Sequence, residues 1–472
     1  MSKLYVFGIG GTGSRVLRSL TMMLAAGVKT SQSDVVPIVI DPDSANADLT
    51  RTVALMNKYA NLRQHLTFPE KGQGTFFKAK IDQILPNYNL LIKDTEDRQF
   101  QQFIELPAMN KQNQAMMRML FSEKNLASSM NVGFKGNPNI GSVVLNQIVN
   151  SEDFITFANS FEKGDKIFIV SSIFGGTGAS GFPLLLKTLR TGDTFPNNDL
   201  INKAEIGAVT ILPYFKLEQS EDSEIDSSTF ISKAKSALAY YENNISKNNQ
   251  INALYFLADN MSNTYANHEG GTQQRNSAHL IEFLAASAAF DFANKHHEGP
   301  AVNKELGLKD NHRTIHMDSF YDELTAMLRM PLTQFMLMSN CVHDKFDFIS
   351  KKNLAANNGN FDEAFYNAPF MQNLKSFLDD YRLWLSEMKD NKRSLDLFNF
   401  DCGDEPFNVV VGQKPKSLFT MLSNYNLFYD RLNNAVKKAK GDKESRWLET
   451  YSIATAQLAK EKFGFLVMMQ NR

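Results

Sequence analysis

A glycine-rich stretch near the middle of the chain constrains its fold more than any other feature. The stretch FGGTGAS at 174–180 follows an apolar run, 166–173, and precedes an amphipathic run, 181–190. This order predicts a strand, a glycine loop and a helix. The N–H groups and the dipole at the start of such a helix favour a bound phosphate, and Thr177 and Ser180 add hydroxyl donors.

A second glycine loop of the same kind lies near the N-terminus. GIGGTGS at 8–14 follows the strand-like segment 3–7 and precedes a helical pattern from Ser14 to Ala26. Taken alone, this GxGGxG loop fits a dinucleotide-binding Rossmann fold, an adenylating domain of the ubiquitin-activating type, another nucleotide fold, or a tight turn without a ligand. Two such loops favour nucleotide binding, and a dinucleotide fold needs only the first.

Composition excludes several classes of protein. The 472 residues predict two or three domains, and 43% hydrophobic with 21% charged residues is typical of a soluble globular protein. The net charge of −1 gives no general attraction to nucleic acid. The two cysteines, Cys341 and Cys402, exclude a disulfide framework. We expect no signal peptide, no membrane insertion and a cytoplasmic location.

Apolar strands alternate with helical patterns in the N-terminal part. Strands are predicted at 35–40, 205–215 and 253–260, with helices at 142–150 and 229–243. Residues 51–130 are polar and mostly helical by pattern. Apolar rather than alternating strands indicate a parallel sheet covered on both faces, and ligands bind such sheets at the carboxyl ends of the strands.

A long, alanine-rich helix is predicted from Ser277 to about His296, and Gly299-Pro300 ends it. We therefore divide the chain into a nucleotide-binding domain at 1–275, a central helix at 276–298 and a C-terminal domain at 299–472. Helical patterns recur in the last domain at 319–340, 371–390, 416–440 and 444–462, with one strand candidate at 407–411. The second domain is therefore predicted to be mostly helical, of the α+β class.

Five motifs occur in an informative order. They are GIGGTGSRV (8–16), VIDPDSANADL (39–49), GFKGNPNIG (133–141), FGGTGASGFP (174–183) and GAVTILPYF (207–215). This ordered set resembles the tubulin/FtsZ superfamily of GTPases, and in particular its bacterial tubulin-like group, over roughly residues 1–296. The resemblance implies a parallel-sheet α/β nucleotide-binding domain with a long central helix and a second domain used for activation and association.

The resemblance also implies a set of nucleotide-binding residues, with GTP or GDP as the ligand and Mg²⁺ held mainly by the phosphates rather than by protein ligands. The set is Gly10, Gly11, Thr12 and Gly13 at the α- and β-phosphates, Asp41 and Asp43 near the ribose or the water shell of the metal, Gly136, Asn137 and Pro138 at the γ-phosphate, Gly175, Gly176, Thr177, Gly178, Ala179 and Ser180 at the phosphates, and Asn276, beside Arg275, at the base. For Asp41, Asp43 and the 136–138 loop, ordinary turn and capping roles are an open alternative. Asn276 fits a plain helix start equally well.

The chain departs from the superfamily in two places. Phe174, Ala179 and Ser180 alter the glycine signature, which affects the γ-phosphate geometry more than phosphate binding itself. The catalytic acid motif that follows the central helix in FtsZ is missing. The weak candidates for the acid are Glu298, Asp318, Asp322 and Glu323.

Three functions follow. The preferred one is a slow, Mg²⁺-dependent GTPase that acts through head-to-tail self-association, with further protein partners possible through the C-terminal domain. The missing acid motif favours a nucleotide-dependent scaffold that does not hydrolyse GTP. A Rossmann-like enzyme, NAD-linked or adenylating, fits the acidic turn at Asp41 but gives the 174–180 loop no role.

Overall fold

The computed structural model describes residues 2–95, 97–130, 133–134, 136–219, 227–248, 250–268, 270–297, 302–305, 307–309, 312–351, 361–416 and 424–465. Its centre is a seven-stranded sheet in the order β3-β2-β1-β4-β5-β7-β9, and every strand pair is parallel. The strands are β1 (Lys3–Ile9), β2 (Asp34–Ile40), β3 (Lys80–Ile81), β4 (Lys166–Ser172), β5 (Glu205–Ile211), β7 (Ala253–Leu257) and β9 (Val302–Glu305). The predicted parallel α/β sheet is confirmed.

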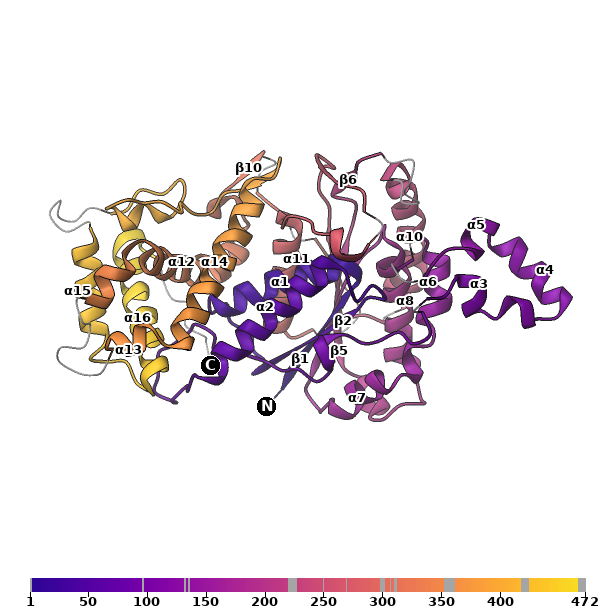
Figure 1. The fold of residues 1–472 in the computed structure, drawn as a ribbon, viewed down its shortest axis with the longest axis horizontal. Coiled ribbons are helices and arrows are strands. Elements are labelled where there is room, and N and C mark those ends of the chain that lie inside the picture. The colour runs from indigo at the N-terminus through magenta and orange to yellow at the C-terminus, as the bar shows by residue number, and fades with distance from the viewer. Residues whose placement is uncertain are drawn as a thin grey trace.

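Both faces of the sheet are covered, because the helices that connect its parallel strands pack on them. All seven residues of β4 are buried, and β1, β2 and β5 each leave only end residues partly exposed. Helices α1 (Gly10–Ala25), α2 (Ala47–Gln64) and α11 (Leu280–Asn294) lie on one side, and α6 (Pro138–Leu145), α8 (Gly176–Thr191) and α10 (Phe230–Asn244) on the other (Figure 1). Continuous apolar strands with helices on both sides bury β1, β2, β4 and β5 almost completely.

Smaller elements surround this core. They are α3 (Phe100–Phe103), α4 (Lys111–Leu120), α5 (Glu123–Leu126), α7 (Glu152–Ser160), α9 (Asn198–Ile201), and a two-stranded sheet of β6 (Phe215–Leu217) and β8 (Asn263–Tyr265). Helices α3, α4 and α5 project from the body as an arm (Figure 1). The prediction that 51–130 is mostly helical is wrong for its middle part, because the described residues of 65–99 contain β3 and a 3₁₀ turn but no α-helix.

Helices dominate the C-terminal part, as predicted. They are α12 (Asp322–Lys351), α13 (Glu363–Tyr366), α14 (Pro369–Lys389), α15 (Tyr425–Ala435) and α16 (Lys443–Phe463), beside a short sheet of β10 (Thr314–Ile315) and β11 (Ser394–Leu395). The strand predicted at 407–411 is wrong. Pro406–Val409 forms a 3₁₀ helix, which Pro406 favours at its first position, and Val410 makes only an isolated bridge with Phe398.

Other predicted boundaries shift by a few residues. Helix α1 begins at Gly10 rather than Ser14, and the central helix α11 is Leu280–Asn294 rather than 277–296. The segment 205–215 divides at Pro213 into β5 and β6, because proline has no N–H for the sheet. The domain limits at 275 and 298 stay predictions.

Trp384 on α14 ties the C-terminal helices to the sheet domain. Its indole Nε1–H donates to Ser19 Oγ on α1 at 3.1 Å. Its ring stacks on that of Phe283 of α11, with the ring centroids 6.0 Å apart. Among the described residues, no helix combines the length and the apolar character that crossing a bilayer needs.

The β1–α1 turn yields the first prediction. A Cβ atom on Gly13 would lie 2.3 Å from the carbonyl carbon of Gly8, whereas one on Gly11 would meet nothing closer than 3.8 Å. We expect Gly13→Ala to lower the free energy of unfolding by about 3 kcal/mol or more, because backbone must move. Gly11→Ala is the matched control and should fold with wild-type stability in urea denaturation. Equal stability of the two variants would contradict the close approach of Gly13 to Gly8.

Candidate nucleotide-binding site

An open cleft lies at the carboxyl ends of β1, β2 and β4. Parallel strands bring the loops that follow them to this one edge of the sheet. The residues that line it are Gly10, Gly11, Thr12, Arg15, Asp41, Asp43, Asn46, Gly133, Phe134, Gly136, Ser172, Phe174, Gly175, Gly176, Thr177, Gly178, Phe215, Leu217, Phe230, Ala266, His268, Gln274 and Asn276. Most of the predicted binding residues are therefore brought together at one place.

The two glycine loops touch each other across the cleft. Gly10 has φ +70°, a conformation that favours glycine, and a Cβ on it would lie 3.3 Å from the Cβ of Thr177. Gly178 is equally constrained, since a Cβ there would lie 2.5 Å from the Ser172 carbonyl oxygen. The glycines thus allow two strand-to-helix turns to meet in a space that larger side chains would fill.

Both turns lead into helices whose first N–H groups have no side-chain cap. Ile9 is at the N-cap position of α1 and Gly175 at that of α8, and neither residue has a side-chain atom that could accept a hydrogen bond. Neither helix has an acid in its first turn. By contrast, Asn46 caps α2 and Ser151 caps α7 through side-chain oxygens. Uncapped donors and two positive dipole ends converge on the cleft, an arrangement that suits an anion such as a phosphate chain.

Residues 133–134 and 136–137 lie against the start of α8. A Cβ on Gly176 would lie 3.0 Å from the Asn137 backbone nitrogen and 3.1 Å from that of Gly136. Gly136 lines the cleft, but Asn137 does not: its side chain caps α6 by accepting from the Asn139 N–H at 3.2 Å. Lys233 Nζ donates to the Gly136 carbonyl at 2.9 Å and so links this loop to α10.

Five residues of the predicted set do not line the cleft: Gly13, Asn137, Pro138, Ala179 and Ser180. The Ser180 hydroxyl donates to the Gly176 carbonyl at 2.7 Å, so it is engaged within its own helix. Ser180 and Ala179 line a neighbouring groove between α6, α8 and α10. Gly13 is buried against Gly8. In this structure the Ser180 hydroxyl is used for an i−4 bond to the backbone, and its role at a phosphate stays a prediction.

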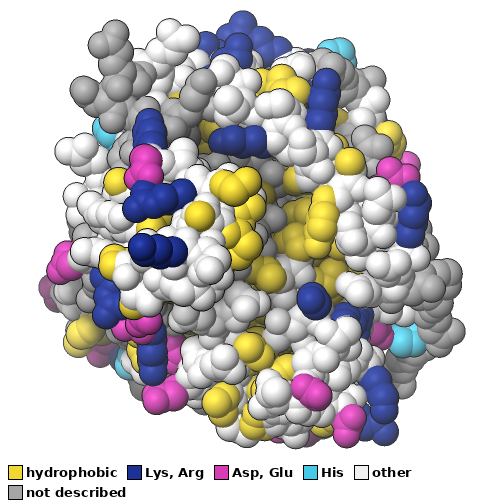
Figure 2. Space-filling view, turned by 90° about the vertical axis from the view of Figure 1, so that its right-hand side faces the viewer, with side chains coloured by type: hydrophobic (Ala, Val, Ile, Leu, Met, Phe, Trp, Pro, Cys, Tyr) yellow, Lys and Arg dark blue, Asp and Glu magenta, His cyan; other side chains and the backbone are white. Residues whose placement is uncertain are grey.

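The groove lies on the side of the molecule seen in Figure 2. That view shows hydrophobic side chains gathered in a central hollow, with lysine and arginine side chains at several places around it. Lys187 and Lys233 are the charged residues of the groove, and its lining contains no acid among the described residues.

Asp41 and Asp43 follow β2 and are 6% and 3% exposed. Asp41 Oδ1 accepts from the Asp43 N–H at 3.1 Å, and Asp43 Oδ2 accepts from the Gly271 N–H at 2.7 Å. Asp43 Oδ1 is buried with no protein partner. Burial raises the pKa of Asp41 to about 7, although the bond from the Asp43 N–H favours its ionised form. The turn role and a ligand role are therefore both compatible with this pair.

Asn276 lines the cleft from the segment that leads into α11. Its backbone N–H donates to both oxygens of Asp48, and its carbonyl accepts from Arg51 Nη2 at 2.7 Å. Its neighbour Gln274 accepts from Asn46 Nδ2 at 2.6 Å and also lines the cleft. Arg275 does not line the cleft.

The candidate catalytic acids lie away from the cleft. Asp318 pairs with Arg329, Asp322 with Lys309 and Glu323 with Lys295, and their side chains are 60%, 93% and 83% exposed. Glu298 falls outside the described residues. Lys295 follows α11 at the amino edge of the sheet, where Lys166 at the start of β4 donates to its carbonyl. Within the described residues, no group of three or more His, Cys, Asp or Glu could hold a metal ion.

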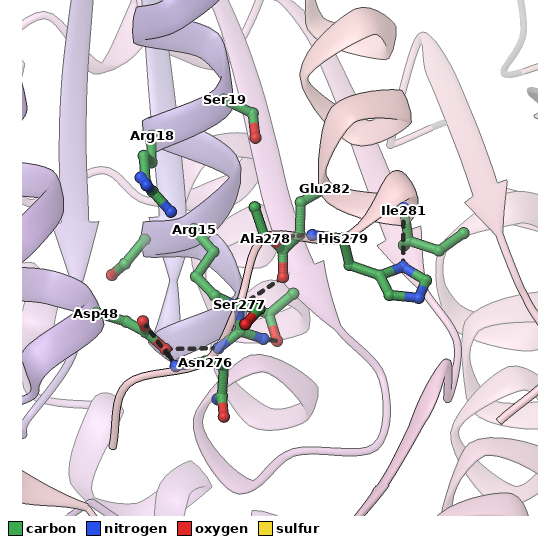
Figure 3. Close-up of polar contacts among 12 residues, drawn as sticks. Arg15, Arg18, Ser19, Asp48, Asn276, Ser277, Ala278, His279, Ile281 and Glu282 are labelled. Carbon is green, nitrogen blue, oxygen red and sulfur yellow. Dashed lines mark hydrogen bonds and ion pairs between the residues drawn. The ribbon is translucent and has the colours of Figure 1, made fainter. Parts of the chain in front are cut away.

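Arg15 is the residue that sequence reasoning missed. It is 3% exposed and lines the cleft from α1. Its guanidinium donates to Glu282 at 2.6 Å, Tyr214 OH at 2.8 Å, Asp48 at 3.1 Å and Thr12 Oγ1 at 3.4 Å. Burial alone would lower the pKa of Arg15, but these partners hold it above its ordinary value. Figure 3 shows Arg15 between Asp48 and the start of α11. A charged residue inside an apolar helix pattern was the available signal.

His279 is the N-cap residue of α11 and fixes the start of this helix. His279 Nδ1 accepts from the Ile281 N–H at 3.1 Å, while Glu282 Oε2 accepts from the His279 N–H at 3.1 Å (Figure 3). Burial lowers the pKa of His279 to about 4, so the ring is neutral near pH 7. The capping box holds Glu282 toward Arg15.

Solved structures of CetZ and FtsZ proteins are similar to this chain at low sequence identity. A GTPγS-bound protofilament of CetZ2 from Haloferax volcanii is 14% identical, with 62% of this chain and 58% of that chain covered and a TM-score of 0.32. CetZ1 from the same organism, a GDP-bound monomer, is 15% identical, with 54% of this chain and 51% of that chain covered and a TM-score of 0.28. An empty FtsZ dimer from M. jannaschii is 17% identical, with 55% of this chain and 45% of that chain covered and a TM-score of 0.27. The matches span about half the length of these chains. No family model and no curated protein matches the sequence.

Asp41 yields a pH prediction. With a folded pKa of about 7 against about 4 in the unfolded chain, the folded state keeps a proton that the unfolded state loses, so this group lowers stability as pH rises from 4 to 7. Asp41→Asn should remove that loss. The free energy of unfolding of the variant minus that of wild type should therefore rise by about 4 kcal/mol between pH 4 and pH 7.5. Urea denaturation of nucleotide-free protein measures it. Parallel pH profiles of the two proteins would contradict the raised pKa.

Proposed function

We propose that this protein binds GTP in the cleft between its two glycine loops and hydrolyses it slowly through head-to-tail self-association. One observation carries the proposal: two strand–loop–helix turns meet at Gly10 and Thr177 with uncapped helix starts directed at one space. A dinucleotide fold needs one such turn, whereas a triphosphate gives both a role.

The residues of the cleft divide the nucleotide between them. The N–H groups at the starts of α1 and α8, with the Thr12 and Thr177 hydroxyls, would bind the phosphate oxygens. Gly133 and Gly136 would lie at the terminal phosphate, and Asn276 with Gln274 at the nucleoside.

Magnesium fits this site through water rather than through direct ligands. Asp43 Oδ1 is a buried acceptor without a protein partner at the edge of the cleft, and Asp41 lies beside it. Bound Mg²⁺ supplies neutralisation of phosphate charge. The two carboxylates would accept hydrogen bonds from its water shell.

Hydrolysis needs a group that orients water, and a second copy is the natural source. Among the described residues, the acids that line the cleft are Asp41 and Asp43, both at the β2 turn, whereas Glu323 pairs with Lys295 at the other edge of the sheet. Head-to-tail stacking would bring the amino edge of one copy to the cleft of the next. The exposed ion pairs of Asp322 and Glu323 would open at low cost for such a contact.

A scaffold that binds GTP without hydrolysis is the second candidate. It is favoured by the distance of Asp318, Asp322 and Glu323 from the cleft and by their pairing with Arg329, Lys309 and Lys295. A Rossmann-like enzyme is less favoured because the contact between the loops would then bind nothing. Partners for the C-terminal helices stay a prediction from the resemblance.

Nucleotide content and turnover test the proposal. We expect guanine nucleotide in the supernatant of denatured, gently purified protein, and phosphate release from added GTP that rises more steeply than protein concentration, because a neighbouring copy completes the site. Guanine nucleotide without turnover would select the scaffold. NAD, ATP or no nucleotide would contradict GTP binding.

A glycine variant tests the phosphate site itself. The Cβ of Gly11→Ala would project where only Arg15 Nη1 and Asn46 Nδ2 lie nearby, at 3.8 and 3.9 Å, so it would occupy cleft space without disturbing the fold. We expect about tenfold or greater weakening of GTP binding by fluorescence titration, at unchanged stability. Gly74→Ala, whose Cβ would also meet nothing closer than 3.7 Å, is the control outside the cleft. Wild-type affinity in Gly11→Ala would place the phosphates elsewhere.

A further inference from the structure

The segment 276–278 joins the cleft to α11 and is held from both sides by its backbone. On the α2 side, the Asn276 N–H donates to Asp48 at 3.2 Å and its carbonyl accepts from Arg51 at 2.7 Å. On the α14 side, the Ala278 N–H donates to Glu387 Oε2 at 2.9 Å, and its carbonyl accepts from Asn391 Nδ2 at 2.5 Å. Figure 3 shows Asn276, Ser277 and Ala278 between Asp48 and the start of α11.

Glu387 is held as a carboxylate by two arginines. Arg18 Nη1 lies 2.6 Å from Oε2 and Arg51 Nη1 lies 2.8 Å from Oε1, and the Glu387 side chain is 13% exposed. Burial raises the pKa of such a group, but the charges of Arg18 and Arg51 bring that of Glu387 below its ordinary value. A buried carboxylate with two arginines and a backbone N–H has little freedom to move.

Arg51 connects the contacts on the α2 side of the segment 276–278 with those on the α14 side. Its guanidinium reaches Glu387, Asp48 and the Asn276 carbonyl, and Asp48 in turn pairs with Arg15 in the cleft wall. Contacts therefore run without interruption from the cleft to α14. Glu387 itself does not line the cleft.

We propose that Glu387 is a positioning residue for the nucleoside end of the cleft. Through the Ala278 N–H and Arg51 it fixes the segment that carries Asn276. Nucleotide affinity is thereby coupled to the packing of α14 against the segment and α2. The inference rests on the proposed function, because it assigns Asn276 to the nucleoside. By linkage, a nucleotide that depends on this segment also strengthens the contact of α14.

The test separates the nucleoside from the phosphates. GTP and inorganic triphosphate are titrated into the full chain carrying Glu387→Gln, which keeps the shape but removes the charge. We expect GTP affinity to fall about tenfold and triphosphate affinity to stay within twofold, because the glycine loops do not depend on Glu387. Amide hydrogen exchange in peptides covering 276–281 should become faster in the nucleotide-free variant.

Asp380→Asn is the matched control, since Asp380 also joins α14 to α2, through Lys58, but at the surface. It should leave both affinities and the exchange unchanged. In an Asn276→Ala background, Glu387→Gln should lose most of its effect on GTP. If Glu387→Gln fails to fold, Asn391→Ala carries the same test; it removes the bond to the Ala278 carbonyl together with an i−4 bond to the Glu387 carbonyl at the end of α14.

Three results would overturn the inference. GTP affinity unchanged in Glu387→Gln, or GTP and triphosphate affinity falling together, would reduce Glu387 to a structural contact. Additive effects of Glu387→Gln and Asn276→Ala would do the same. Wild-type protein that binds neither GTP nor triphosphate would instead overturn the proposed function, and with it the nucleoside role of Asn276.

Discussion

The buried guanidinium of Arg15 is the interaction on which the arrangement of the site depends. It joins α1 to Asp48 on α2, to Glu282 on α11 and to Tyr214 after β5, all in a region almost closed to solvent. Removing one partner would leave a charge buried without compensation, at a cost of about 3–5 kcal/mol. A network with this penalty specifies one packing of the elements that form the cleft walls.

The glycines contribute in the opposite way, through the absence of side chains. Gly13 allows α1 to start against Gly8, Gly178 allows α8 to start against Ser172, and Gly10 allows the two turns to meet at Thr177. The helix starts are therefore closer together than larger residues permit, with their donors unused by caps. The ion pairs behind the cleft and the missing side chains within it together leave one open space at the two helix starts, which suits an anion.

Local patterns predicted the sheet and most of the cleft because each signal lay within one short segment. Apolar runs gave the strands, and strand–glycine–helix order placed Gly10, Gly11, Gly176 and Thr177 at one edge. The orientation of Ser180 was not predictable, since its hydroxyl either faces a ligand or bonds to the backbone at i−4. The strand predicted at 407–411 failed because its valines fit a 3₁₀ turn after Pro406 equally well.

Pairings across long sequence distances were also out of reach. Arg15 meets Glu282, and Arg18 meets Glu387, across 267 and 369 residues. A single sequence gives no indication of which buried acid faces which arginine. The segment 276–278 shows the consequence, because as a helix start it looked unremarkable, while in the fold it is the joint between cleft and α14.

The polarity of the sheet links these observations to the proposed function. A parallel sheet has two unlike edges: here the carboxyl edge carries the glycine loops, and the amino edge carries the end of α11 with Lys166 and Lys295. Helix α11 runs between them, from the Glu282 capping box beside Arg15 to Asn294. Under the proposed function, a nucleotide bound at the carboxyl edge would be fixed through Asn276 and the start of this helix, while the other end of the same helix would face the next copy. One rigid element would thus report occupancy of the cleft to the surface on which assembly depends.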